Sequence, residues 1–110
     1  LSTIVLKANN TINQFETKHT KLSTSLDDLT GFYKVKAGIN SRDFLTVEFF
    51  ARKAGSIKWV SQGVDTGAPY SIYIDPLDFS KKKIQVKAIA HNSKGESFVF
   101  PITKLTLSTP

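Results

Sequence analysis

The residues of this chain best able to do chemistry are aromatic rings and lysines, because the usual catalytic groups are scarce. The 110 residues include no cysteine, and the two histidines, His19 and His91, stand alone in their segments. A serine–histidine site needs an orienting third group and an oxyanion hole, and no segment indicates either. The chain also has neither a nucleophile-elbow sequence nor a phosphate-binding glycine loop. We therefore expect no enzymatic activity and no cofactor.

Exposed aromatic rings are the first candidate binding groups, since such rings stack on the faces of sugars. Alternate residues of a strand point to opposite faces, and this parity places Phe50 and Tyr73 outward. The single tryptophan, Trp59, falls in a short strand that we expect near a sheet edge. These three residues form the candidate ligand platform. The structural alternatives are that Trp59 packs against the protein and that Phe50 is covered by residues 9–24 or by a neighbouring domain.

Lysines are the second candidate, because the net charge is +6 and thirteen of the fifteen basic residues are lysines. A basic domain attracts polyanions. Few arginines argue against nucleic-acid readout, which favours bidentate contacts. The run Lys81, Lys82 and Lys83 is the candidate polyanion contact, joined by Lys34, Lys36 and Lys87 at outward positions. The alternative is a solvated turn that discourages edge aggregation.

No metal site is expected, although aspartates are frequent in the predicted turns. Calcium takes several oxygen ligands, and no segment has the dense alternation of aspartates that a calcium loop requires. Turn formation explains these residues better. They are Asp27, Asp28, Asp43, Asp65, Asp75 and Asp78.

Alternating apolar residues broken by turns predict an all-β fold, an antiparallel sandwich of about seven strands. We expect one domain over residues 1–110, taken from a larger protein, and no apolar run is long enough to span a membrane. In the connection 76–83, Leu77 and Phe79 are expected to cover the edge of the core. The strands are predicted at residues 4–7, 32–39, 44–52, 57–62, 70–75, 84–91 and 96–107, with a helical turn at 25–29 and a loop at 63–69.

Parity within these strands predicts the core. The most regular strand, residues 84–91, is followed by the turn Asn92-Ser93-Lys94-Gly95 and a second extended run, which indicates a β-hairpin. Pro101 cannot donate to a ladder, so the last strand is expected to be an edge or to carry a bulge there. The predicted inward residues are Tyr33, Val35, Ala37, Ile39, Leu45, Val47, Phe49, Tyr70, Ile72, Ile74, Ile84, Val86, Ala88 and Ala90.

Two groups of residues resemble known families. Ile84, Val86, Ala88, Ala90, Asn92, Gly95 and Ser97 match the penultimate strand and turn of fibronectin type III modules, except that Ile84 replaces the usual tyrosine. Val47-Glu48-Phe49, Trp59 and the segment from Asp65 to Ser71 are similar to bacterial immunoglobulin-like modules, although His91 and Asn92 replace an expected aspartate. Together the matches cover about residues 31–107, most of the domain.

The resemblance implies an accessory module of an exported or cell-surface protein, bacterial in origin. Its expected role is non-catalytic: it spaces, orients or packs against neighbouring domains of the same chain. The alternative role is to bind a carbohydrate or cell-wall polymer through the exposed aromatics. An adaptor between proteins is a third interpretation. Fold alone does not choose among these functions.

Overall fold

The computed structural model describes residues 21–39, 44–80 and 82–108, and within these ranges the regular secondary structure is almost entirely β-strand. One 3-10 turn, η1 (Pro76–Asp78), interrupts the strands. None of the described residues belongs to a helix that could cross a membrane. The eight strands are β1 (Leu22–Leu26), β2 (Tyr33–Ala37), β3 (Thr46–Lys53), β4 (Val60–Asp65), β5 (Ser71–Ile74), β6 (Lys83–His91), β7 (Ser97–Val99) and β8 (Thr103–Thr106).

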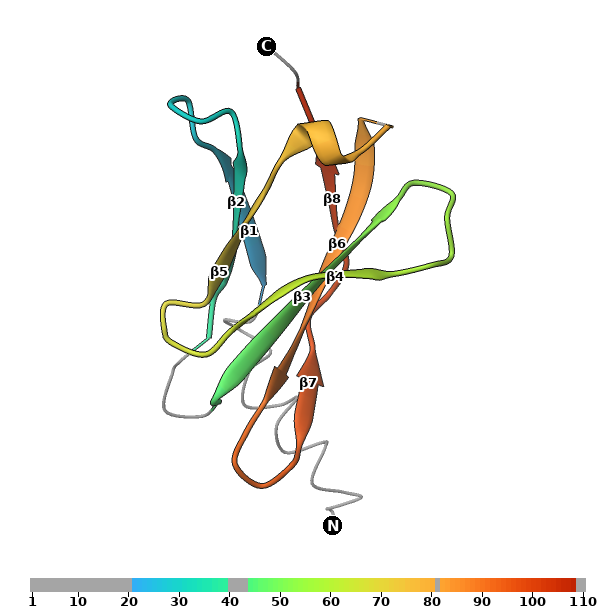
Figure 1. The fold of residues 1–110 in the computed structure, drawn as a ribbon. Coiled ribbons are helices and arrows are strands. Elements are labelled where there is room, and N and C mark those ends of the chain that lie inside the picture. Colours follow the sequence, from blue (N-terminus) through green and yellow to red (C-terminus); the bar gives the residue numbers. More distant parts are fainter. Residues whose placement is uncertain (1–20, 40–43, 81, 109–110) are drawn as a thin grey trace.

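The strands form two antiparallel sheets that face each other (Figure 1). The smaller sheet has the order β1-β2-β5. The larger sheet has the order β4-β3-β6-β7, and β8 pairs with β6 as well. Strands β7 and β8 pair with different parts of β6, and Pro101 lies in the break between them. As predicted, this last run lies at the edge of the sheet, and the structure divides it into two strands at Pro101.

One core joins the two sheets, and strand parity explains most of its members. Ile84, Val86, Ala88 and Ala90 of β6 are at most 1% exposed, and Val47 and Phe49 of β3 are fully buried. From the smaller sheet come Tyr33, Val35, Ala37 and Ile74, all buried, with Ile39 and Ile72 packed against the cluster. These inward positions are as predicted, because a sandwich buries one face of each strand.

Several expectations fail at element ends. Leu45 is 56% exposed, because β3 begins only at Thr46 and the preceding Phe44 fills the core instead. Leu77 is 80% exposed on η1, so only Phe79 covers the core edge there. The expected helical turn at 25–29 is the end of β1 and a turn. The expected loop at 63–69 is partly strand, because β4 continues to Asp65. The expected strand at 4–7 lies outside the described residues.

The hairpin between β6 and β7 is confirmed, and Asn92 holds its turn. The Asn92 side-chain oxygen accepts hydrogen bonds from the backbone N–H groups of Lys94 and Glu96, both at 3.0 Å. Its Nδ2 donates to Glu96 Oε1 at 2.9 Å. Gly95 takes a φ of 82°, which favours glycine. The connection therefore depends on one side chain and one glycine.

Tyr70 joins the two sheets at the end where β3 begins. Its ring is 2% exposed, and its hydroxyl donates a hydrogen bond of 2.7 Å to the carbonyl oxygen of Phe44. Burial, and secondarily the charge of Asp65, raise the pKa of the Tyr70 phenol above its ordinary value. The phenol proton is therefore held more tightly in the folded protein than in the unfolded chain.

The substitution Tyr70→Phe tests how much this hydroxyl contributes to the stability of the folded protein. At neutral pH it should lower the free energy of unfolding by about 1 kcal/mol, because the Phe44 carbonyl loses its donor. The contribution of Tyr70 is complete below the unfolded pKa near 10 and is lost as pH rises through the raised folded pKa. Urea unfolding of the parent chain and of Tyr70→Phe, at pH 7 and at pH 11, measures the difference between their free energies of unfolding. A stability gap that stays constant between these pH values would contradict the assignment.

Candidate functional site

A β-bulge decides on which side of the molecule Trp59 lies. Strands β3 and β4 pair Phe49 with Gly63 but Phe50 with Ser61, so Gln62 is the extra residue of the bulge. In an unbroken register, Trp59 would come opposite Lys53, which shares the parity of the inward residues of β3. The bulge moves it by one position, next to Arg52 on the outer face of the larger sheet.

On that outer face Trp59 is the centre of a cluster of aromatic and basic side chains. The guanidinium carbon of Arg52 lies 4.2 Å from the centre of the Trp59 ring. Lys87 Nζ lies 4.5 Å from the same ring and 5.6 Å from the ring of Phe50. These are cation–π contacts, which hold the cations in place without neutralising them. We call Phe50, Arg52, Trp59, Lys87 and Gln85 the aromatic–basic cluster.

Two polar contacts order the cluster further. Arg52 Nε donates a hydrogen bond of 2.7 Å to Gln85 Oε1, across the β3–β6 pair. The Ser61 hydroxyl donates a hydrogen bond, also of 2.7 Å, to Glu48 Oε2. Glu48 is the outward residue of β3 two positions before Phe50. The side chains of Arg52 and Lys87 are half-buried. The cluster is thus a partly desolvated surface with two charges in defined positions.

The three aromatic residues of the predicted platform do not come together. Phe50 and Trp59 share the outer face of the larger sheet, joined through Lys87. Tyr73 is 53% exposed, as predicted, but it stands on β5 of the smaller sheet, opposite Lys34 of β2. The two sheets pack through their inner faces, so Tyr73 points to the other side of the molecule. Phe50 is half-buried beneath Lys87, which covers it in part.

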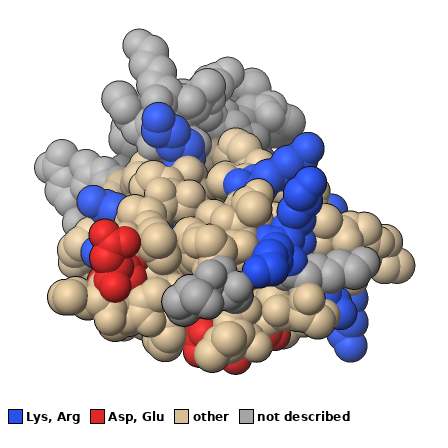
Figure 2. Space-filling model, turned by 90° about the horizontal axis from the view of Figure 1, so that it is seen from above, with Lys and Arg blue, Asp and Glu red and all other residues tan. Residues whose placement is uncertain are grey.

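The predicted polyanion lysines are divided in the same way. Lys34 and Lys36 stand on the outer face of the smaller sheet, whereas Lys83 and Lys87 stand on that of the larger one. Both Lys82 and Lys83 are exposed, and Lys81 lies outside the described residues. Figure 2, which views the molecule from the end where β6 begins, shows the largest group of Lys and Arg at the right, further basic side chains at the upper left, and Asp and Glu at the left and along the lower edge.

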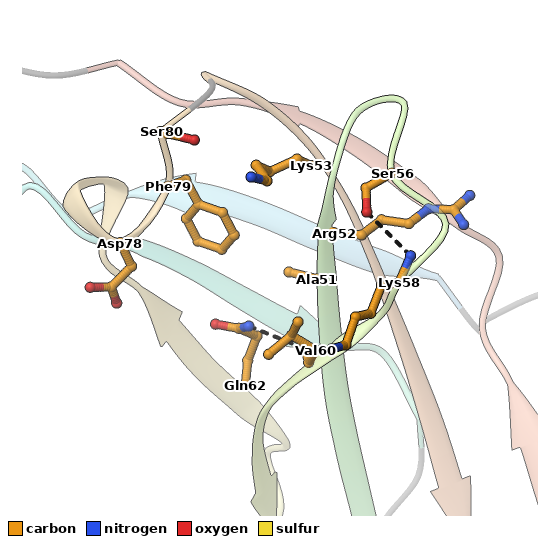
Figure 3. A pocket seen from close by; sticks show the side chains of 10 residues that line it. All are labelled: Ala51, Arg52, Lys53, Ser56, Lys58, Val60, Gln62, Asp78, Phe79 and Ser80. Atoms are coloured by element: carbon orange, nitrogen blue, oxygen red, sulfur yellow. Dashed lines mark hydrogen bonds between the residues drawn. The ribbon is translucent and has the colours of Figure 1, made fainter.

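A groove of about 590 Å³ opens beside the cluster, at the edge of the sandwich near η1. Ala51, Val60 and Phe79 line it with apolar surface, and Figure 3 shows the Phe79 ring pointing into it and the Arg52 guanidinium pointing away. Val60 is 52% exposed although it pairs with the buried Ala51, because β4 is the edge strand of the larger sheet. The polar lining consists of Arg52, Lys53, Ser56, Lys58, Gln62, Asp78 and Ser80.

The aspartates of the turns act as backbone acceptors. Asp65 accepts from Gly67 N and Ser71 N, and Asp27 and Asp75 each accept from the residue two positions later. In the described part of the chain, no three histidine, aspartate or glutamate side chains are grouped so that they could hold a metal. His91 is exposed at the end of β6, opposite Thr46 and Ser97.

Sequence reasoning missed Arg52 and Gln85 as members of the site. Both occupy outward positions of strands that were correctly predicted, so parity could have placed them on one face. Their contact with Trp59 depends on the register across β3, β4 and β6 and on the bulge. This register cannot be derived from the sequence. The one local hint was Gly63, because a glycine within a strand often marks a bulge.

Comparisons with known proteins find a shared fold but no family. No family model matches the chain, and no curated protein is significantly similar to it. A crystal structure described as a polysaccharide deacetylase from Bacillus anthracis matches 83% of this chain with a TM-score of 0.65 and 14% identity. A polysaccharide deacetylase from Bacillus cereus matches 83% with a TM-score of 0.65 and 13% identity. This chain spans only 31% of either of those chains.

These neighbours correct the family assignment made from the sequence. Both are described as polysaccharide deacetylases, and neither as an immunoglobulin-like or fibronectin type III module. The assignment to those modules is wrong, and so is the role of a non-catalytic spacer that followed from it. The residues that suggested it specify a buried strand, an Asn–Gly turn and alternating strands. Those features belong to antiparallel sheets in general, so they carried information on fold and not on family.

Gly63 offers a direct test of how the bulge positions the cluster. Its φ of +134° is rare for residues with a side chain, although a Cβ there would meet only Ile72 Cγ2 at an ordinary 3.8 Å. Gly63→Ala should therefore lower the free energy of unfolding by about 1–3 kcal/mol. It should also shift the fluorescence emission of Trp59. Because the chain has a single tryptophan, the emission can be assigned to this residue.

Gly67→Ala is the matched control for that experiment. Gly67 has no positive φ, and a Cβ there would meet nothing within 4 Å. We expect its stability to stay within about 0.5 kcal/mol of the parent chain, with unchanged emission. If both glycine variants behave alike, the bulge does not position Trp59.

Proposed function

We propose that this chain is the β-rich part of a polysaccharide-acting protein and that it contacts polysaccharide through the aromatic–basic cluster. The observation that carries the proposal is the position of Trp59 on the outer face, beside Arg52 and Lys87. Ring surface contacts the apolar faces of sugars, and the neighbouring amide and cations meet their oxygens. The shared fold with two polysaccharide deacetylases supports a carbohydrate partner.

The groove at the sandwich edge extends this surface. Arg52 belongs both to the cluster and to the lining of the groove, so the two surfaces are adjacent. The groove has apolar walls and a rim of hydroxyl, amide and charged groups, a mixture that suits sugars. A polymer lying on the cluster would therefore reach the groove around the edge strand β4. Such a role fits the extracellular or cell-surface location expected from the sequence.

The substitution Trp59→Ala tests the proposed function. Retention of the chain on insoluble cellulose, chitin, xylan, starch and isolated cell walls should fall about tenfold or more on the polymer that binds, because a central tryptophan dominates such contacts. The measurement is the bound fraction after centrifugation, with thermal unfolding to verify that the variant is folded.

Tyr73→Ala is the control, because it removes an exposed aromatic ring from the opposite sheet. Its retention should equal that of the parent chain. Equal losses in the two variants would mean that the cluster is not the contact surface. The absence of binding to every polysaccharide, neutral or anionic, would refute the proposed function itself.

A further inference from the structure

Four basic side chains share the outer face of the larger sheet. Lys83, Gln85 and Lys87 alternate along β6 and therefore face the same way. Gln85 pairs with Arg52 on one side and with Lys104 on the other. Because neighbouring strands are about 4.8 Å apart, Arg52 and Lys104 lie about 10 Å from each other. We call Arg52, Lys83, Lys87 and Lys104 the basic face.

Little negative charge balances the basic face. Among the outward strand residues that the structure describes on this sheet, the acid is Glu48, and Ser61 occupies one of its oxygens. Within the described ranges, none of the four cations forms an ion pair with an acid. The Debye length is about 8 Å at physiological salt, so cations about 10 Å apart largely escape mutual repulsion and can share one face. An anionic ligand in direct contact with them would be screened much less.

The contacts of Trp59 favour the same kind of ligand. Arg52 and Lys87 already lie against its ring, at 4.2 Å and 4.5 Å, so less of the ring is open to stack on a neutral sugar. Arg52 is also held at Nε by Gln85, which leaves its terminal nitrogens to donate outward. A guanidinium held in this way binds carboxylate or phosphate through paired hydrogen bonds.

We propose that the polysaccharide bound by this chain is anionic, and that the basic face recognises its carboxylate or phosphate groups. This inference rests on the proposed function and names the ligand class for the same surface. Lys83 and Lys104 extend the recognition beyond the aromatic–basic cluster, along β6 and across to β8. The opposite sheet offers Lys34 and Lys36, which are too far around the molecule to join them.

The test compares two double variants with the same loss of charge. Lys83→Ala with Lys104→Ala removes half of the basic face, whereas Lys34→Ala with Lys36→Ala removes two lysines from the other sheet. Binding of each full 110-residue chain is measured by titration against polygalacturonate, its fully methyl-esterified form and a phosphomannan, from low to high salt. These polymers distinguish recognition of carboxylate from recognition of phosphate. Duplex DNA is included to test whether the chain prefers a nucleic acid to a polysaccharide.

We expect the parent chain to bind an anionic polymer, with affinity that falls steeply as salt rises. The variant at positions 83 and 104 should bind about tenfold more weakly and show a smaller salt dependence, while the variant at 34 and 36 stays near the parent chain. Equal binding of the neutral, esterified polymer would overturn the inference but leave the proposed function intact. Equal losses in the two variants, or tighter binding to DNA, would also overturn it. No binding to any polysaccharide would refute both.

Discussion

The packing of β6 is the constraint on which the rest of the structure depends. This strand pairs with β3 along one edge and with β7 and β8 along the other, and its inner residues are almost completely buried. Ala88 lies opposite Phe49 and Ala90 opposite Val47, so small side chains face larger ones in the core. Once this face is buried, the alternate residues of β6 must point to solvent, and that is where its lysines lie.

Burial on one side thus creates the candidate site on the other. Strand β3 turns Val47, Phe49 and Ala51 inward, which leaves Phe50 and Arg52 outward, opposite Lys87 and Gln85 of β6. A one-residue shift of either strand would move these side chains into the core. The site therefore shares its stability with the fold, because the hydrophobic pattern that sets the register also places the charges.

The two sheets also explain why composition alone misleads about binding. The net charge of +6 is spread over the chain, yet the fold separates the lysines of β2 from those of β6 and β8. It separates Tyr73 from Trp59 in the same way. The likeness to two deacetylases, at 13–14% identity and over 31% of their length, shows a shared fold and assigns no function to these residues.

The amino-acid sequence by itself determined the all-β class, most of the buried positions and the Asn92–Gly95 turn, because alternation and turn chemistry are local properties. It also placed Phe50 and Tyr73 outward. Only the tertiary structure decided which outward residues meet, since contacts between strands depend on register and on sheet membership. The bulge at Gln62 brings Trp59 to Arg52. Tyr73 is separated from both because its strand, β5, belongs to the other sheet. These are long-range pairings, and no local pattern encodes them.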